Sequence, residues 1–87
     1  MAYSTKIDWH PGVDVSAFMG KPAYVKRRVA DFVPYAENGK LCFAGALEFD
    51  GDWDWHIWGF TIDSHGSHSQ LERYPLRRGD VLAIDTD

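Results

Sequence analysis

Apolar and polar side chains alternate along much of the chain, which predicts short β-strands. Residues 3–9 follow this period-two pattern and predict an amphipathic strand. Asp14 can then cap a single helical turn within residues 14–19. Toward the other end of the sequence, residues 71–76 and 81–84 predict two further strands on either side of a turn.

The middle of the chain, residues 23–62, predicts a three-stranded antiparallel meander. Periodicity in its first segment, residues 23–33, fits a helix as well as a strand, and the β-branched and aromatic content favours the strand. Asn38-Gly39 follows, and Asn-Gly between apolar runs is the strongest short hairpin signal because both turn positions need positive φ. A second two-residue turn at Asp50-Gly51 keeps the same hydrogen-bonding parity along the central strand.

This register predicts which side chains share a face of the sheet. It places Arg27 opposite Asp50 and Phe43 opposite Trp58. One face then carries the bulkier core, and the second face is also largely apolar. The bulkier face consists of Phe32, Pro34, Leu41, Phe43, Leu47, Phe49, Trp58 and Phe60, and the second face of Val29, Val33, Tyr35, Cys42, Ala44, Ala46, Trp53, Trp55 and Ile57.

The whole pattern predicts one small, mainly β domain over residues 1–87, with a small α+β fold as the alternative. We expect a five- to six-stranded antiparallel meander that closes into a small barrel or a sandwich. Because both faces of the meander are apolar, the second face needs a cover. A curled sheet would provide this cover, and so would a homodimer formed through this apolar face.

Composition narrows the class of protein. The chain has 87 residues, of which 45% are hydrophobic and 25% charged, as in a folded globular domain. A formal charge of −4 argues against nucleic acid and anionic membrane surfaces as partners. No apolar run reaches the roughly 18 residues of a membrane span. Without a secretory signal and with a single cysteine, Cys42, the sequence predicts a reduced thiol in a cytoplasmic protein.

Tryptophans and carboxylates concentrate around the second hairpin turn. Aromatic faces beside carboxylates suit an organic cation, a stacked ring, or the Arg and Lys side chains of a protein partner. The alternative is that the tryptophans are core residues and the acids form a solvated turn. We therefore expect a non-catalytic binding module without a cofactor. Its candidate binding residues are Glu48, Asp50, Trp53, Asp54, Trp55 and His56.

Histidines support a rival hypothesis, a small hydrolase or isomerase. His56 with Asp54 could act as an acid or base near neutral pH, and Asp63, His65 and His68 could hold a divalent metal. The simpler interpretations are a core histidine with a satisfied hydrogen bond and a solvated loop. Since neither a nucleophile elbow nor a glycine-rich phosphate loop is present, the sequence leans away from an enzyme. A small acidic inhibitor or adaptor protein is the third hypothesis.

The sequence also contains two groups of basic residues that are candidates for binding phosphate: Lys26-Arg27-Arg28, and Arg73 with Arg77-Arg78. They would hold phosphates only if the fold brought them together. Within a strand, Arg27 and Arg28 point to opposite faces, so the triplet is not a single patch. Nucleic-acid binding is therefore not favoured.

Overall fold

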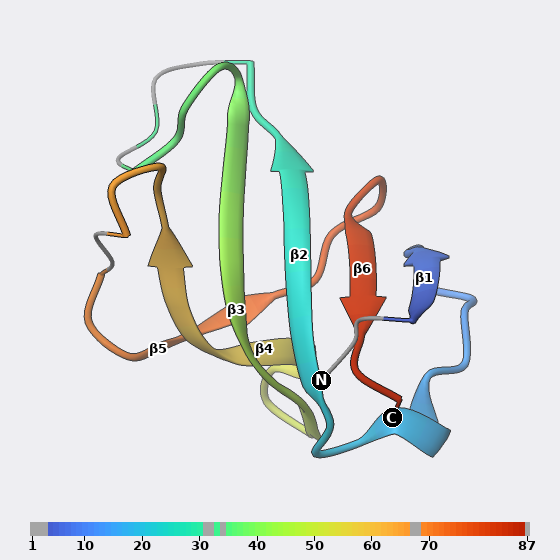
Figure 1. The fold of residues 1–87 in the computed structure, drawn as a ribbon. Helices are drawn as coiled ribbons and strands as arrows, with labels where there is room; N and C mark the ends of the chain where they lie inside the picture. The colour runs from blue at the N-terminus through green and yellow to red at the C-terminus, as the bar shows by residue number, and fades with distance from the viewer. Residues whose placement is uncertain (1–3, 31–32, 34, 67–68, 87) are drawn as a thin grey trace.

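The computed structural model describes residues 4–30, 33, 35–66 and 69–86, and its regular structure is almost entirely β. One 3-10 turn, η1 (Ser16–Phe18), lies just after Asp14, whose carboxylate accepts the Ser16 N–H at 3.0 Å. The predictions of a mainly β fold and of a helical turn near residues 14–19 are confirmed. Within the described chain, no helix has the length and apolar character needed to cross a membrane. Six strands form one antiparallel sheet (Figure 1): β1 (Thr5–Asp8), β2 (Pro22–Arg28), β3 (Lys40–Asp50), β4 (Asp54–Ile62), β5 (Glu72–Pro75) and β6 (Val81–Ile84).

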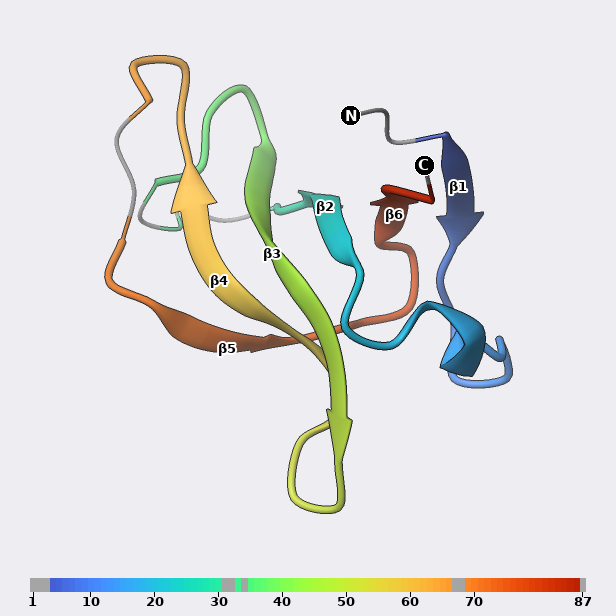
Figure 2. The same cartoon turned by 60° about the horizontal axis from the view of Figure 1, so that its bottom comes forward.

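The strands lie in the order β1-β6-β2-β3-β4-β5. Strands β2 to β5 form a meander, and β6 returns to pair with β2 on one side and β1 on the other. Residues 76–80 carry the chain back from β5 to β6, and the sheet curls strongly between its two edges (Figures 1 and 2). No ladder joins β1 to β5 in the residues described, so the sheet is curled and is not closed by hydrogen bonds.

Strand alternation gives the sheet an inner face and an outer face. The inner face holds the core, where Phe43 and Leu82 lie opposite Val25 and all three are fully buried. Burying a side chain of this size contributes about 1.5–3 kcal/mol. The outer face is only partly covered, and it is marked by Tyr24, Ala44, Ala46, Trp58 and Ala83.

Strands β3 and β4 approach each other closely at a pair of glycines. Gly45 lies directly opposite Gly59. A Cβ added to Gly45 would overlap the main-chain oxygen of Trp58, and one added to Gly59 would overlap that of Ala44. Glycine within a strand commonly marks such a close approach of two backbones. The β3–β4 ladder curves along its length and helps to enclose the core (Figure 2).

The predicted Asn38-Gly39 turn is confirmed. Glu37 and Lys40 exchange both main-chain hydrogen bonds, at 2.8 and 2.9 Å. Asn38 and Gly39 adopt φ values of 52° and 72°, the positive values that such a turn requires. The turn does not join β2 directly to β3, because β2 ends at Arg28. The Gly39 carbonyl also accepts the Val29 N–H at 3.0 Å.

The register between β2 and β3 differs from the predicted one. The strand expected over residues 23–33 is shorter, and Val25 lies opposite Phe43. Arg27 therefore sits at the other end of β3 from Asp50, and the predicted pairing of these two residues is wrong. The observed register buries Val25 against Phe43 and leaves the charged side chains that alternate with it on the outer face, which explains why it is preferred.

The second hairpin has a three-residue loop in place of the predicted Asp50-Gly51 turn, because Asp50 pairs with Asp54. The Asp50 carboxylate accepts the N–H groups of Asp52 and Trp53 at 2.9 and 2.7 Å. This aspartate-centred turn stabilises the longer loop. Asp54 then takes the left-handed conformation, with φ of 54°, that ends it.

The longer loop reverses the two faces of β4. Phe43 lies opposite Thr61 and not opposite Trp58, a displacement of three residues. A displacement by an odd number of residues moves every side chain of a strand to the other face. Two residues assigned to the bulkier face, Phe32 and Pro34, lie outside the described residues. The face assignment is wrong for Trp55 and Ile57, which are inner, and for Trp58 and Phe60, which are outer.

Candidate functional site

Exposed aromatic rings gather on the outer surface of the β3–β4 hairpin. The Trp53 side chain folds back from the loop, and its ring centroid lies 6.3 Å from that of His56. Trp58 follows His56 on the same face of β4. Trp53 is 43% exposed and Trp58 36% exposed. Large apolar side chains that remain exposed as a group are a common mark of interaction surfaces.

Arg73 lies at the centre of these rings. It is opposite Trp58 on β5, and its guanidinium carbon is 4.9 Å from the Trp58 ring centroid and 5.9 Å from that of Trp53. Both are cation–π distances. Its Nε is 3.9 Å from Asp50 Oδ2, and since both side chains are well exposed this ion pair contributes at most about 1 kcal/mol. The two tryptophans thus already receive one guanidinium group.

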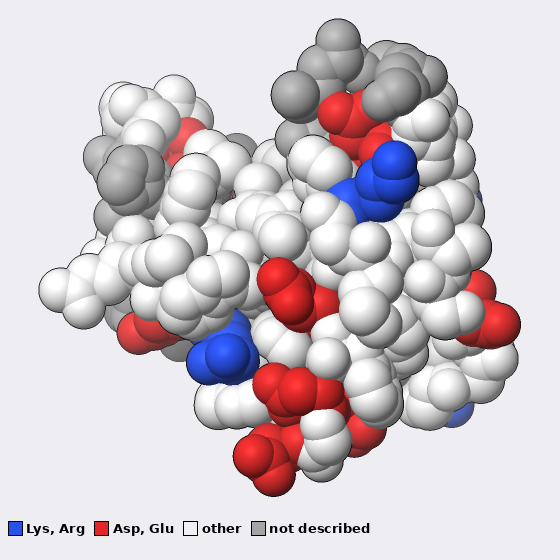
Figure 3. Space-filling view, turned by 90° about the horizontal axis from the view of Figure 1, so that it is seen from below, with Lys and Arg blue, Asp and Glu red and all other residues white. Residues whose placement is uncertain are grey.

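Carboxylates surround the same hairpin tip, as the red atoms at the lower edge of Figure 3 show. Glu48 and Asp50 lie on β3, Asp52 in the loop and Asp54 at the start of β4. Among the residues described, neither Asp52 nor Asp54 forms an ion pair. Four carboxylates therefore accompany a single guanidinium. We use the name hairpin patch for Glu48, Asp50, Asp52, Trp53, Asp54, Trp58 and Arg73.

The candidate binding residues do not all meet at one surface. Glu48, Asp50 and Trp53 belong to the hairpin patch, whereas Trp55 is on the inner face opposite Phe49, with ring centroids 5.2 Å apart. The prediction that Trp53 and Trp55 share a face is wrong. The cause is the three-residue loop, which sets the register of β4.

Sequence reasoning misses two members of the hairpin patch, Trp58 and Arg73. A two-residue turn assigns Trp58 to the bulkier face, so its exposure goes unrecognised. Arg73 comes from the weakly patterned segment that forms β5. The signal that could have revealed the exposure of Trp58 is Asp50, because an aspartate that can accept N–H bonds from the next residues favours a longer loop.

His56 lies beneath this surface and does not open onto it. The side chain is 2% exposed, and its Nδ1 is 2.9 Å from the main-chain oxygen of Asp54. Asp54 thus contacts the imidazole through its main-chain oxygen and not through its carboxylate. A buried ring with a satisfied nitrogen matches the core interpretation of His56 better than an acid–base role.

The candidate metal ligands lie in the loop after β4. There Asp63 Oδ1 accepts the His65 N–H at 2.9 Å, which is a local turn interaction. His68 lies outside the described residues. Within the described ranges, no three side chains of His, Cys, Asp or Glu come together in a way that could hold a metal ion.

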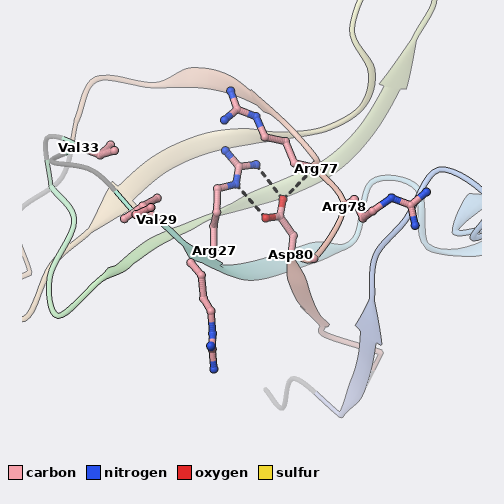
Figure 4. Close-up of a pocket in the computed structure, with 9 residues that line it drawn as sticks. Arg27, Val29, Val33, Arg77, Arg78 and Asp80 are labelled. Atoms are coloured by element: carbon pink, nitrogen blue, oxygen red, sulfur yellow. Dashed lines mark hydrogen bonds and ion pairs between the residues drawn. The ribbon is translucent and has the colours of Figure 1, made fainter.

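The basic groups meet in part around a hollow of about 430 Å³. Arg27, Arg28, Arg77 and Arg78 line it, but Arg27 is neutralised by the buried Asp80, whose Oδ2 lies 2.8 Å from Nη2. Figure 4 shows the Arg77 and Arg78 side chains pointing away from each other. The hollow is thus organised around an ion pair, and its remaining cations do not converge on one point.

Comparison with protein-family models, curated proteins and solved structures finds no match to this chain. Function is therefore inferred from geometry and chemistry alone.

Proposed function

We propose that the protein is a non-catalytic binding module whose hairpin patch takes an arginine- or lysine-bearing segment of a partner protein. The observation that carries this proposal is the position of Arg73, whose guanidinium lies over the exposed rings of Trp58 and Trp53. A surface that accommodates a resident guanidinium has the shape and electronic character to accept a second one on its exposed ring area.

Charge supports the same class of partner. The tip carries Asp52 and Asp54 without ion pairs in the described chain, and Asp50 meets Arg73 only at 3.9 Å. A basic segment would place its cations among these carboxylates while its side-chain stems cover Trp53 and Trp58. Aromatic anchors with a charged rim are the usual composition of an energetically dominant contact.

The test is titration of the protein with two peptides that alternate glycine with arginine or with glutamate. We expect the arginine peptide to bind, and the indole N–H resonances of Trp53 and Trp58 to shift in an NMR spectrum. Trp58→Ala and Trp53→Ala should each weaken binding about tenfold, as truncation of an anchor does. Raising the salt from 50 to 500 mM should weaken it further because exposed charges are screened.

Two further variants make the result specific. Met19→Ala removes another exposed apolar side chain outside the hairpin patch and should leave affinity unchanged. Arg73→Gln removes the resident cation and should raise affinity, since the incoming guanidinium then meets less repulsion. Equal binding of the two peptides, or equal losses in Trp58→Ala and Met19→Ala, would rule the proposal out.

A further inference from the structure

A second groove lies on the outer face, over the three strands on the other side of the sheet from β5. It has a volume of about 380 Å³ and is lined by Lys6, Tyr24, Lys26, Val81 and Ala83. Strands β1, β6 and β2 run side by side beneath it (Figure 1). None of these residues belongs to the hairpin patch, so the groove is a separate feature of the molecule.

The strand register explains why the groove has an apolar floor and two basic walls. Ala83 lies between Lys6 on β1 and Tyr24 on β2, and Val81 lies opposite Lys26. Strand β6 thus presents two small apolar side chains, and its neighbours present longer ones. Val81 is 38% exposed, which leaves apolar surface open to a ligand.

The charges around the groove favour an anion. Neither Lys6 nor Lys26 forms an ion pair within the described part of the chain. Asp8 lies on the same face, opposite Val81, and does not line the groove. Two ammonium groups therefore flank the floor, with one carboxylate beyond its edge.

A hydrogen bond to the neighbouring strand holds the Tyr24 wall in place. The Tyr24 hydroxyl donates to the Cys42 thiol sulfur, and this bond, together with partial burial, raises the pKa of Tyr24 to about 12. The phenol is neutral over the physiological range, as an ordinary tyrosine is, and its ring can act as an apolar wall.

We propose that this groove binds a small amphiphile consisting of one carboxylate on an apolar tail, such as a medium-chain fatty acid. The tail would lie on Val81, Ala83 and the Tyr24 ring, and the carboxylate would meet the ammonium groups of Lys6 and Lys26. The volume falls at the small end of the range for ligand sites, which is about 300–1,000 Å³, and so favours a small ligand.

Titration calorimetry with octanoate, and with 1-octanol as its uncharged analogue, tests the proposal on the full chain. We expect octanoate to bind with a Kd at or below about 1 mM and octanol to bind at least tenfold more weakly. Lys6→Met and Lys26→Met keep an apolar stem and remove the charge, so each should weaken octanoate binding about fivefold. Asp8→Asn should strengthen it about twofold because it removes a repulsive charge.

Lys40→Met provides the matched control, since Lys40 is an exposed lysine on β3 that does not line the groove. It should leave octanoate binding unchanged, and so should Trp53→Ala in the hairpin patch. Equal affinity for octanoate and octanol would overturn the proposal. Equal losses in Lys6→Met and Lys40→Met would overturn it as well, because they would reflect net charge and not the groove.

Discussion

Two arginines lie over aromatic rings in this protein, and they sit in opposite environments. Arg27 has its guanidinium carbon 5.0 Å from the Phe43 ring centroid, on the inner face. The guanidinium carbon of Arg73 lies 4.9 Å from the Trp58 ring centroid, on the outer face. The stacking distances are nearly equal, so the difference between the two sites lies in the other partners of each guanidinium.

Arg27 is fixed by several hydrogen bonds. Its Nε and Nη2 meet the two carboxylate oxygens of Asp80 at 2.9 and 2.8 Å, and Nη2 also donates to the Pro75 main-chain oxygen at 2.7 Å. Asp80, 1% exposed, accepts the Arg77 N–H as well (Figure 4). This network ties β2 to the segment between β5 and β6, and so helps to hold the curl of the sheet.

Within the described residues Arg73 has a single distant carboxylate as its ionic partner, and it remains well exposed. Cation–π stacking alone therefore does not define the role of an arginine. A desolvated, bidentate pair makes Arg27 part of the framework, whereas Arg73 stays exposed over rings that are themselves partly exposed.

The same substitution at both arginines tests the difference between their roles most directly. Arg27→Met should destabilise the fold by about 3–5 kcal/mol, because it leaves the Asp80 carboxylate buried without its counter-ion. Arg73→Met should cost less than about 1 kcal/mol. Urea unfolding followed by tryptophan fluorescence measures both values, and similar losses in the two variants would show that the distinction is unfounded.

The stability of the sheet that carries both arginines also depends on the close approach of β3 and β4 at Gly45 and Gly59. Gly59→Ala should destabilise the protein by about 1–3 kcal/mol, because its Cβ would overlap the Ala44 backbone. Gly51→Ala serves as the control, since no atom lies within 4 Å of a Cβ at that position. Thermal unfolding should show a clear decrease of Tm for Gly59→Ala alone. Equal Tm values would mean that the strands can separate without cost.

A smaller effect on the stability of the fold should come from Tyr24, on the outer face, at high pH. The pKa of Tyr24 is raised from its ordinary value of 10.0 to about 12, mainly by the hydrogen bond to Cys42. The folded state therefore holds this proton more tightly than the unfolded state does. Its contribution to stability is complete below pH 10 and is lost as the pH rises from about 10 to about 12.

Phenolate absorbance and stability measured together over this range provide the check. Tyr24→Phe should remove the titration step near pH 12, and Cys42→Ala should move that step toward lower pH. A step that stays in place in Cys42→Ala would exclude the thiol as its cause.

Much of the fold follows from local pattern. The short apolar run at residues 81–84 coincides with β6, and Asn38-Gly39 forms the expected turn because few other dipeptides accept two positive φ values. Such features depend on a few neighbouring residues, so a single sequence contains enough information to predict them.

Register was less predictable, because the core and the loops decide it together. The shape of the second loop depends on the Asp50 carboxylate accepting the N–H of Trp53, and a rule based on Asp-Gly turns ignores that side chain. The resulting error reversed the faces of β4, which concealed Trp58 as a surface residue and placed Trp55 on the wrong side. Glu48, Asp50, Trp53 and Asp54 were predicted from the sequence and lie together in the hairpin patch, whereas Trp58, whose exposure depends on the register, was assigned to the bulkier face.

The hydrogen bond between Ser4 Oγ and Thr86 Oγ1, 2.5 Å long, brings the two ends of the described chain together. Ser4 directly precedes β1 and Thr86 follows β6, and the pairing of these two strands spans almost the whole sequence. Joining these ends through a short linker and reopening the chain in the loop after β4 would give a circular permutant with the same strand neighbours. In that permutant, β6 and β1 would form a hairpin, so the pairing that now closes the longest loop would become local in sequence. The topology thus allows the hairpin patch to be kept while the order of folding events is changed.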